Sequence, residues 1–416
     1  MLVPSAKEFF SFEPGVTYLN HGATGVTPRE VLDTREAVRR AVEESPVPYA
    51  LDTQRPAWQK VAALVAERFG VAGQEVALIG NVTEGINAIL RAQAFAPGDE
   101  ILTTSTGYGS ITMTAEHIAK SHGAKVTLAA IDPFSPSPEQ ALDAVRAAIT
   151  PRTKLAILDH ITSGTALVMP IAAMTKLCHE RGVQVLVDAA HVPGNIPFSI
   201  KETGADWYVA SLHKWHFAPR GCAFLWAAPD RQAALQPSIL SWDSKYPFPN
   251  NFQFTGTRDD SNFLSIPAAF GFMDRLGEDN VLRHNHALIR QGRDILAEAW
   301  GVRGKVPDEM IGSMILVPLP EDLPYKADDD GCYALQQHLA RKHSIVAYVP
   351  FAAQGRLWTR VAAQIYNGPE DFEKLAKVVL DMRKPGYDRA DPPYRPSAIE
   401  KILNIGPIRP PDSRPG

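Results

Sequence analysis

The middle of the chain alternates short apolar runs with longer stretches in which apolar residues recur every three or four positions. The first pattern predicts β-strands, and the second predicts amphipathic helices. Strands are expected at 75–80, 100–105, 125–131, 154–161 and 183–190, and helices at 84–94, 110–122, 138–149 and 170–181. Strands that alternate with helices indicate βαβ crossovers, so we expect a mostly parallel sheet that is covered on both faces.

After about residue 265 the pattern changes to longer helices separated by single strands, which predicts a smaller α+β domain. The expected helices are 266–276, 280–300, 331–342 and 369–383, and the expected strands are 314–319, 344–349 and 356–366. The proline-rich end disfavours regular structure apart from a helical turn or two at 397–403, so we expect a surface-draped or disordered tail. The expected division is an N-terminal segment (1–50) that packs with the small domain, a large α/β domain (51–262), the small C-terminal α+β domain (263–383) and the tail (384–416).

The composition excludes several classes of protein but does not indicate which reaction the chain catalyses. Apolar residues make up 45% and charged residues 21%, and the formal net charge is −4, so nothing favours nucleic acid or an anionic membrane as partner. No apolar stretch approaches the ~20 residues of a spanning helix, and the first residues do not form a secretory signal. The three cysteines lack the spacing of a metal site and fit a reducing compartment. A cytoplasmic enzyme that acts on a small molecule is the leading expectation, with no metal.

Two residues in the middle of the chain carry candidate chemistry. Asp188 ends an otherwise apolar strand, which is where open α/β sheets bind ligands. By itself this carboxylate equally fits a helix cap or the partner of a core arginine. Lys214 stands among aromatic and small residues, and an apolar setting lowers the pKa of a lysine and makes its amine a nucleophile toward carbonyls. Together the two residues are more specific than either one alone.

Four segments around these residues resemble a known family. They are NVTEGIN (81–87), DAAHVPG (188–194), SLHKWHFAPRGCAF (211–224) and QFTGTRD (253–259), and the likeness extends from residue 18 to residue 372. The chain resembles the class V aminotransferase branch of the fold-type I pyridoxal 5′-phosphate (PLP) enzymes. Within that branch it is most similar to isopenicillin N epimerases and hercynylcysteine sulfoxide lyases. The resemblance implies a seven-stranded sheet in the large domain, PLP as cofactor, and a homodimer with active sites at its interface.

The resemblance also implies a role for each residue around the cofactor ring. Lys214 matches the lysine that forms the internal aldimine, and Asp188 matches the carboxylate that pairs with the protonated pyridine nitrogen. Tyr108 matches the aromatic ring that stacks on the pyridine, and His191 matches a residue beside the phenolic oxygen. Ser163 matches a position that often contacts this oxygen as asparagine, although serine is shorter.

A second group of residues is expected around the cofactor's phosphate. In the resemblance Thr83 is the N-cap of a helix that starts at Glu84, so that exposed N–H groups face the phosphate. Thr257 matches a residue that reaches the phosphate in the neighbouring subunit. The phosphate-side residues implied within one chain are Val82, Thr83, Glu84, Ser211 and His213.

Substrate-binding residues follow from the same resemblance. Arg360 matches the arginine that binds the substrate's α-carboxylate, and arginine suits this planar group because it binds it with two hydrogen bonds. Asn20 and His21 match the N-terminal segment that closes over substrate. The second acid–base group is left open among His21, His216 and Tyr108.

The implied reaction begins at Cα of an amino acid or an amino-acid-derived substrate, through a lysine aldimine and a quinonoid. Epimerase or racemase chemistry is our first expectation, and C–S lysis of a cysteine-derived sulfoxide is the main alternative, followed by transamination or a natural-product cyclisation. A cysteine desulfurase is disfavoured because residues 343–360 contain no cysteine. A non-enzymatic binding protein is disfavoured because Asp188, His191, Lys214 and Arg360 are all present.

Overall fold

A seven-stranded sheet forms the centre of the larger part of the molecule, in a computed structural model that describes residues 6–302, 304–390 and 398–403. The strand order is β2-β8-β7-β6-β5-β3-β4, in which β8 runs antiparallel to both of its neighbours and the other pairings are parallel. The strands are β2 (Val76–Ile79), β3 (Glu100–Thr104), β4 (Lys125–Ala129), β5 (Thr153–Asp159), β6 (Gln184–Ala189), β7 (Trp207–Ser211) and β8 (Ala223–Ala227). The predicted α/β fold of the type I PLP enzymes is confirmed, as are the five predicted strands, whereas β7 and β8 were not predicted.

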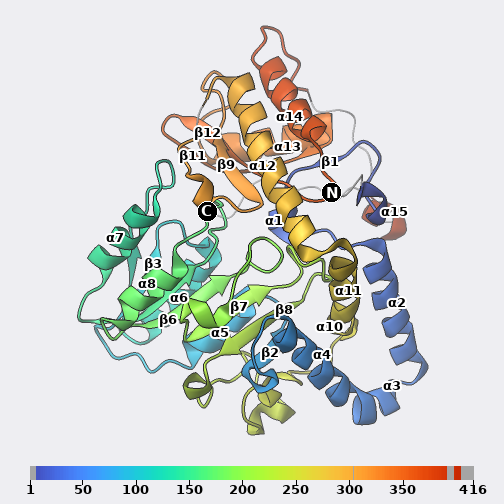
Figure 1. The fold of residues 1–416 in the computed structure, drawn as a ribbon, viewed down its shortest axis with the longest axis vertical. Coiled ribbons are helices and arrows are strands. Elements are labelled where there is room, and N and C mark those ends of the chain that lie inside the picture. The colour runs from blue at the N-terminus through green and yellow to red at the C-terminus, as the bar shows by residue number, and fades with distance from the viewer. Residues whose placement is uncertain (1–5, 303, 391–397, 404–416) are drawn as a thin grey trace.

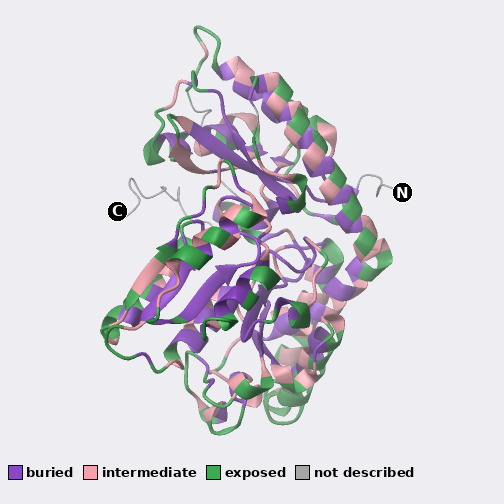
Figure 2. Ribbon diagram, turned by 60° about the vertical axis from the view of Figure 1, so that its left-hand side comes forward, coloured by how far each residue is buried: buried purple, intermediate pink, exposed green. Residues whose placement is uncertain are grey.

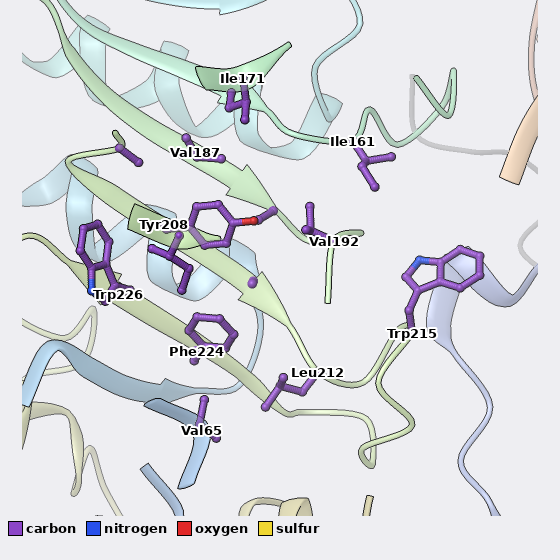
Figure 3. Packing of buried hydrophobic residues seen from close by; sticks show 14 of the residues in the cluster. Val65, Ile161, Ile171, Val187, Val192, Tyr208, Leu212, Trp215, Phe224 and Trp226 are labelled. Carbon is purple, nitrogen blue, oxygen red and sulfur yellow. The ribbon is translucent and has the colours of Figure 1, made fainter. Parts of the chain in front are cut away.

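Helices cover both faces of this sheet (Figure 1). They are α4 (Gln54–Arg68), α5 (Val82–Arg91), α6 (Gly109–Ser121), α7 (Pro138–Ala148) and α8 (Ile171–His179). Because successive strand residues point to opposite faces, Val187 and Tyr208 belong to one apolar core, and Leu186 and Val209 belong to another. Figure 3 shows the first of these cores, and Figure 2 shows that the central strands are buried while the outer helices have an exposed side.

The smaller part of the molecule has its own antiparallel sheet, with strand order β11-β12-β9 (Figure 1, top). Its strands are β9 (Met314–Pro318), β11 (Tyr348–Ala353) and β12 (Arg356–Ala362), and its helices are α12 (Glu278–Trp300), α13 (Asp329–His343) and α14 (Pro369–Met382). A separate apolar core fills the space between this sheet and these helices. No helix in the described ranges is long and apolar enough to cross a membrane.

The N-terminal segment contacts both parts. Its short strand β1 (Thr17–Tyr18) pairs in parallel with β10 (Ile345–Val346) of the smaller part, and α1 (His21–Thr24) follows at once. The next helix, α2 (Arg29–Glu44), lies along α10 (Ser261–Leu264) and α11 (Ile266–Leu276), which share the first core of the large sheet. The exact domain boundaries remain predictions.

Residues 384–390 of the tail lie against the smaller domain. The Tyr387 hydroxyl forms hydrogen bonds of 2.8 and 2.6 Å with the Nε2 atoms of His338 and His343, and α15 (Ala398–Leu403) forms where a short helix was expected. Residues 391–397 and 404–416 of the predicted tail lie outside the described residues. The remaining short helical segments are η1 (Ala6–Phe9), α3 (Pro46–Pro48), η2 (Tyr49–Thr53), η3 (Gly73–Glu75), α9 (Ile200–Thr203), η4 (Pro229–Arg231), η5 (Trp242–Lys245), η6 (Asn250–Phe252) and η7 (Asp308–Met310).

Candidate active site

The predicted cofactor residues meet at the carboxyl ends of the parallel strands, the edge at which open α/β sheets bind ligands. A cavity of about 190 Å³ opens there. Its lining contains most of the predicted cofactor residues, namely Val82, Thr83, Tyr108, Ser163, Asp188, His191, Ser211, His213 and Lys214. Four lining residues were not predicted: Ala23, Asn81, Asp159 and Ala190. A larger cavity of about 270 Å³, between α4, β2 and η6, has no ionisable side chain in its lining. The smaller cavity is therefore the better candidate for chemistry.

Strand order arranges four reactive side chains in a row. Lys214 follows β7, Asp188 lies on β6, Asp159 ends β5, and Tyr108 follows β3. Because the sheet order is β7-β6-β5-β3, Lys214 and Tyr108 come from opposite sides of the two carboxylates. Residues that lie far apart in the sequence are thus brought to one cavity by the parallel sheet.

The environment of Lys214 favours the neutral form of its amine. Burial lowers the pKa of its ammonium group to about 8, against the opposing attraction of Asp188. Its Nζ lies 3.1 Å from Nε2 of His191, and the Trp215 indole N–H points at Nδ1 of the same imidazole at 3.4 Å. Burial and the charge on Lys214 hold the pKa of His191 well below its usual range, so the ring is neutral. If Nδ1 accepts from Trp215, the ring proton is on Nε2, and a neutral Lys214 amine accepts it.

Asp188 is a buried carboxylate with one backbone donor. Its Oδ1 accepts the N–H of Ala190 at 2.9 Å, and the side chain is buried at the edge of the cavity. Burial raises the pKa of Asp188, while the Ala190 N–H and the charge on Lys214 lower it. A carboxylate in this environment is stabilised by a cationic partner, so it suits a protonated ring nitrogen.

Asp159 also lines the cavity, and sequence reasoning missed it. It is buried, and its Cα is the register partner of Asp188 on the neighbouring strand. No motif marks Asp159, but the sequence holds one signal, since KLAILD and VQVLVD are both apolar runs that end in aspartate. Two parallel strands that end alike place their last side chains at the same edge of the sheet.

The helix expected at the phosphate begins earlier than predicted, and its cap is a different residue. Asn81, not Thr83, is the N-cap of α5, and its side chain accepts the backbone N–H of Glu84 at 2.9 Å. The Glu84 carboxylate accepts the Gly80 N–H at 2.8 Å and does not line the cavity. Val82 and Thr83 are in the first turn, where backbone N–H groups lack helical partners and favour an anion such as phosphate.

Arg360, on β12 of the smaller domain, does not line the cavity but contacts Ser163, which does. Its Nη1 donates to the Ser163 carbonyl at 2.5 Å and its Nη2 to Oδ1 of Asn20 at 2.9 Å, while the Tyr348 ring lies 4.8 Å from the guanidinium carbon. Among the residues that the structure describes, no carboxylate pairs with this buried cation, and its Nε lacks a partner. Burial lowers the pKa of Arg360 to about 10. A buried guanidinium without a counter-ion favours an anionic ligand.

Of the three candidates for a second acid–base group, Tyr108 alone lines the cavity. His216 is fully buried beside Phe270, 3.7 Å from a Glu278 oxygen. His21 is buried against Trp215, and its Nδ1 bonds the Tyr366 hydroxyl at 2.8 Å. Tyr108 is 48% exposed, so its phenol is accessible to a ligand and to water.

Thr257 is exposed and lies outside the lining of the cavity in this chain. Its expected contact belongs to a neighbouring subunit and stays a prediction. The residues that do line the cavity fit PLP in kind: an amine with a lowered pKa, a buried carboxylate, and a helix N-terminus supported by a serine and a histidine.

Comparison with known proteins agrees with this geometry. Residues 17–321 match the family described as Aminotransferase class-V. The chain belongs to this family. It is 27% identical to an L-cysteine desulfhydrase of Arabidopsis thaliana, over 91% of this chain and 90% of the relative. It is 29% identical to an isopenicillin N epimerase of Amycolatopsis lactamdurans, over 91% of this chain and 98% of the relative.

Solved structures share the fold of this class V chain. A cystine C–S lyase in complex with cysteine persulfide has a TM-score of 0.75 and 20% identity, over 89% of this chain and 98% of that one. The cysteine desulfurase CsdA of Escherichia coli has a TM-score of 0.72 and 20% identity, over 90% of this chain and 96% of that one. At such identities the likeness establishes the architecture alone.

The cap assignment is open to a direct test in the cofactor-free protein. Asn81→Ala removes the side chain that accepts the Glu84 N–H, and we expect the free energy of unfolding to fall by about 1 kcal/mol. The matched control is Thr83→Ala, which changes no cap and should leave the melting temperature unchanged or slightly higher. Calorimetric melting of both variants decides the point, and a larger loss in Thr83→Ala than in Asn81→Ala would contradict our assignment.

Proposed function

We propose that this chain is a PLP-dependent enzyme of the epimerase or racemase type, which removes and returns the Cα proton of an amino-acid-type substrate. The observation that carries the proposal is the order of side chains along the sheet edge. Lys214 and Tyr108 flank the two carboxylates from opposite sides of the same cavity. Inversion at Cα requires proton carriers on two faces of the reacting carbon, and the proposal assigns one face to Lys214 and the other to Tyr108.

Different residues of the cavity would bind different parts of the cofactor. PLP, when bound, supplies an aldehyde that captures amines and a ring that withdraws electrons from the substrate's Cα. Asp188 would hold the ring nitrogen in its protonated form, and the first turn of α5 would bind the phosphate together with Ser211 and His213. His191 fixes the position of the Lys214 amine through the 3.1 Å contact.

The proton and carboxylate chemistry then follows from this chain's own groups. Lys214 Nζ, with its pKa lowered to about 8, acts as the general base at Cα near neutral pH. Arg360 binds the substrate carboxylate with the N–H groups that now contact Asn20 and Ser163. Tyr108 delivers a proton from the opposite face.

A C–S lyase that acts on a cysteine-derived substrate is the second candidate. It is supported by relatives named L-cysteine desulfhydrase that match more than nine-tenths of this chain. Such a reaction uses the same base, Lys214, but needs no proton carrier that inverts Cα. A persulfide-forming desulfurase is disfavoured, because Cys178, Cys222 and Cys332 are all buried and β10, β11 and β12 contain no cysteine.

We further infer a homodimer from the exposed apolar side chains at one end of the large domain. Leu51 and Trp242 are each 78% exposed. Their segments lie side by side, because Arg55 forms a 2.7 Å ion pair with Asp243 and also covers the Tyr246 ring. The same loop reaches the cavity region, where the Ser238 hydroxyl donates to the Glu84 carbonyl at 3.3 Å. A second copy of the chain on this surface would contact the loop that is hydrogen-bonded to α5, whose first turn lines the cavity, and exposed apolar patches of this kind mark interfaces.

Cofactor capture by Lys214 should depend on pH as its lowered pKa requires. Only the neutral amine attacks an aldehyde, so the rate should rise about tenfold per pH unit and level off above pH 8, not near the ordinary lysine value of ~10.4. The measurement is borohydride trapping of apoprotein mixed with PLP, followed by peptide mass spectrometry. Lys214→Ala should give no labelled peptide. A rate that still climbs at pH 10, or a label on another lysine, would contradict the assignment.

The reaction itself is tested by proton NMR in deuterated water, with D- and L-amino acids, peptides and cysteine sulfoxides. We expect deuterium at Cα with inversion and no keto acid. Tyr108→Phe should keep exchange with retention through Lys214 and lose inversion by about 100-fold, the usual contribution of one acid–base group. Pyruvate and ammonia from a sulfur substrate would instead establish the lyase. Inversion that survives in Tyr108→Phe would exclude Tyr108 as the second carrier.

The dimer is tested by charge at the proposed interface. Light scattering should show a dimer for the natural sequence and monomers for the double variant Leu51→Asp, Trp242→Asp. Loss of one buried anchor weakens an interface by about 2 kcal/mol, which is roughly thirtyfold in affinity. Leu128→Asp is the matched control, since Leu128 is 53% exposed on the edge strand β4 and should leave the dimer intact. An active monomer of the natural sequence at assay concentration would refute the shared interface.

A further inference from the structure

The second buried carboxylate has no role in the proton transfers described above. Asp159 and Asp188 are register partners on neighbouring parallel strands, so both side chains point to the same face of the sheet. Strands in a sheet are about 4.8 Å apart, which brings the two carboxyl groups close together. Both residues line the cavity, and each is at most 5% exposed.

The charges that face this pair do not allow both carboxylates to be ionised at little cost. Lys214, after β7, is the cation that acts on both, and it is itself partly neutral near pH 8. Tyr108, after β3, contributes a backbone N–H and a phenol, and the first turn of α5 contributes amide groups. Two buried carboxylates so close together share one proton, because two like charges in a poorly solvated site repel strongly.

The surroundings decide which carboxylate carries the proton. Burial and the negative charge on Asp188 raise the pKa of Asp159 well above its usual value. Burial also raises the pKa of Asp188, but the charge of a second carboxylate does not add to this rise, and its Oδ1 accepts the Ala190 N–H at 2.9 Å. Backbone N–H groups and the charge on Lys214 lower the pKa of both carboxyl groups. The charge therefore stays on Asp188, and Asp159 carries the proton.

Asp159 also lies against the loop that carries Tyr108. The backbone N–H of Tyr108 is close enough to the Asp159 carboxyl group to lower its pKa, against the larger effect of burial. The preceding residue, Gly107, passes so close that a Cβ there would lie 3.1 Å from both the Thr103 hydroxyl and the Thr104 carbonyl, and 3.4 Å from Oδ2 of Asp159. The loop thus has little freedom, and Asp159 is one of its fixed points.

We propose that Asp159 is a positioning residue of the cofactor site: an uncharged carboxylic acid that fixes the Tyr108 loop beside the cavity and leaves Asp188 as its only carboxylate charge. The inference rests on the proposed function, because it assigns Asp159 to the site that holds PLP. Its consequence is that the cofactor's ring nitrogen meets one negative charge and not two, so its protonation is governed by Asp188 alone.

The test separates charge from position with two substitutions at one residue. Asp159→Asn keeps the shape and the acceptor oxygen and removes only the ability to ionise. We expect it to keep the midpoint of the pH titration of the bound cofactor's visible absorbance, and a PLP dissociation constant within about twofold of the natural value. Asp159→Ala removes the carboxyl group that lies against the Gly107–Tyr108 backbone and should weaken PLP binding about tenfold. Asp188→Asn is the control that moves the midpoint.

Infrared spectroscopy gives a readout that needs neither activity nor cofactor. The natural protein should show a protonated carboxylic acid band near neutral pH that is absent from Asp159→Asn, both with and without PLP. A missing band, or an Asp159→Asn midpoint that moves as far as in Asp188→Asn, would mean that Asp159 is ionised and would overturn the proposal. Natural PLP affinity in Asp159→Ala would overturn the positioning role. If the natural protein bound no PLP, the proposed function would fail, and the band would still decide whether Asp159 is protonated.

Discussion

The desolvation of charge at the carboxyl edge of the sheet is the constraint on which the rest of the site depends. A lysine and two carboxylates are withdrawn from water there, and their ionisation is set by one another more than by solvent. The chain around Lys214 is covered from two sides at close range. A Cβ at Gly25 would lie 2.0 Å from the His213 carbonyl oxygen, and one at Gly194 would lie 2.5 Å from that of Trp215. Both glycines also have positive φ, so no other residue fits at either position without displacing the lysine segment.

The sequence patterns predict the elements well where one physical signal dominates. The apolar runs of β2, β3, β5 and β6 are almost entirely buried on both faces, and α11 begins and ends where its 3.6-residue periodicity does. Strands β7 (WYVAS) and β8 (AFLWA) were not predicted, although both are short runs rich in aromatic and aliphatic residues, which favour strands. The cap of α5 was misplaced because Asn81 and Thr83 are both good capping residues, and only the backbone geometry distinguishes them.

Other parts of the site depend on contacts that no local pattern contains. Asp159 is found from strand register, since its partnership with Asp188 joins residues of different strands. The parallel pairing of β1 with β10 joins residues more than 300 positions apart, and it places Asn20 at the guanidinium of Arg360. Motif resemblance does recover most of the residues around Lys214, because their segments each contribute several neighbouring side chains to the one cavity.

The proposed epimerisation and the alternative C–S lysis would use the same Lys214, Arg360 and cofactor site, and similarity of 27–29% to proteins of both names does not choose between the two reactions. The choice depends on the face of the cavity opposite Lys214. His21 and His216 are withdrawn into the core, where burial lowers the pKa of each to about 3 and keeps both rings neutral. Tyr108 is accessible, and its loop lies against Asp159. A group that transfers a proton to or from Cα becomes charged in one of its two states, and that charge is costly to bury. The Tyr108 phenol is half-exposed beside the cavity and can be solvated, whereas His21 and His216 are fully buried.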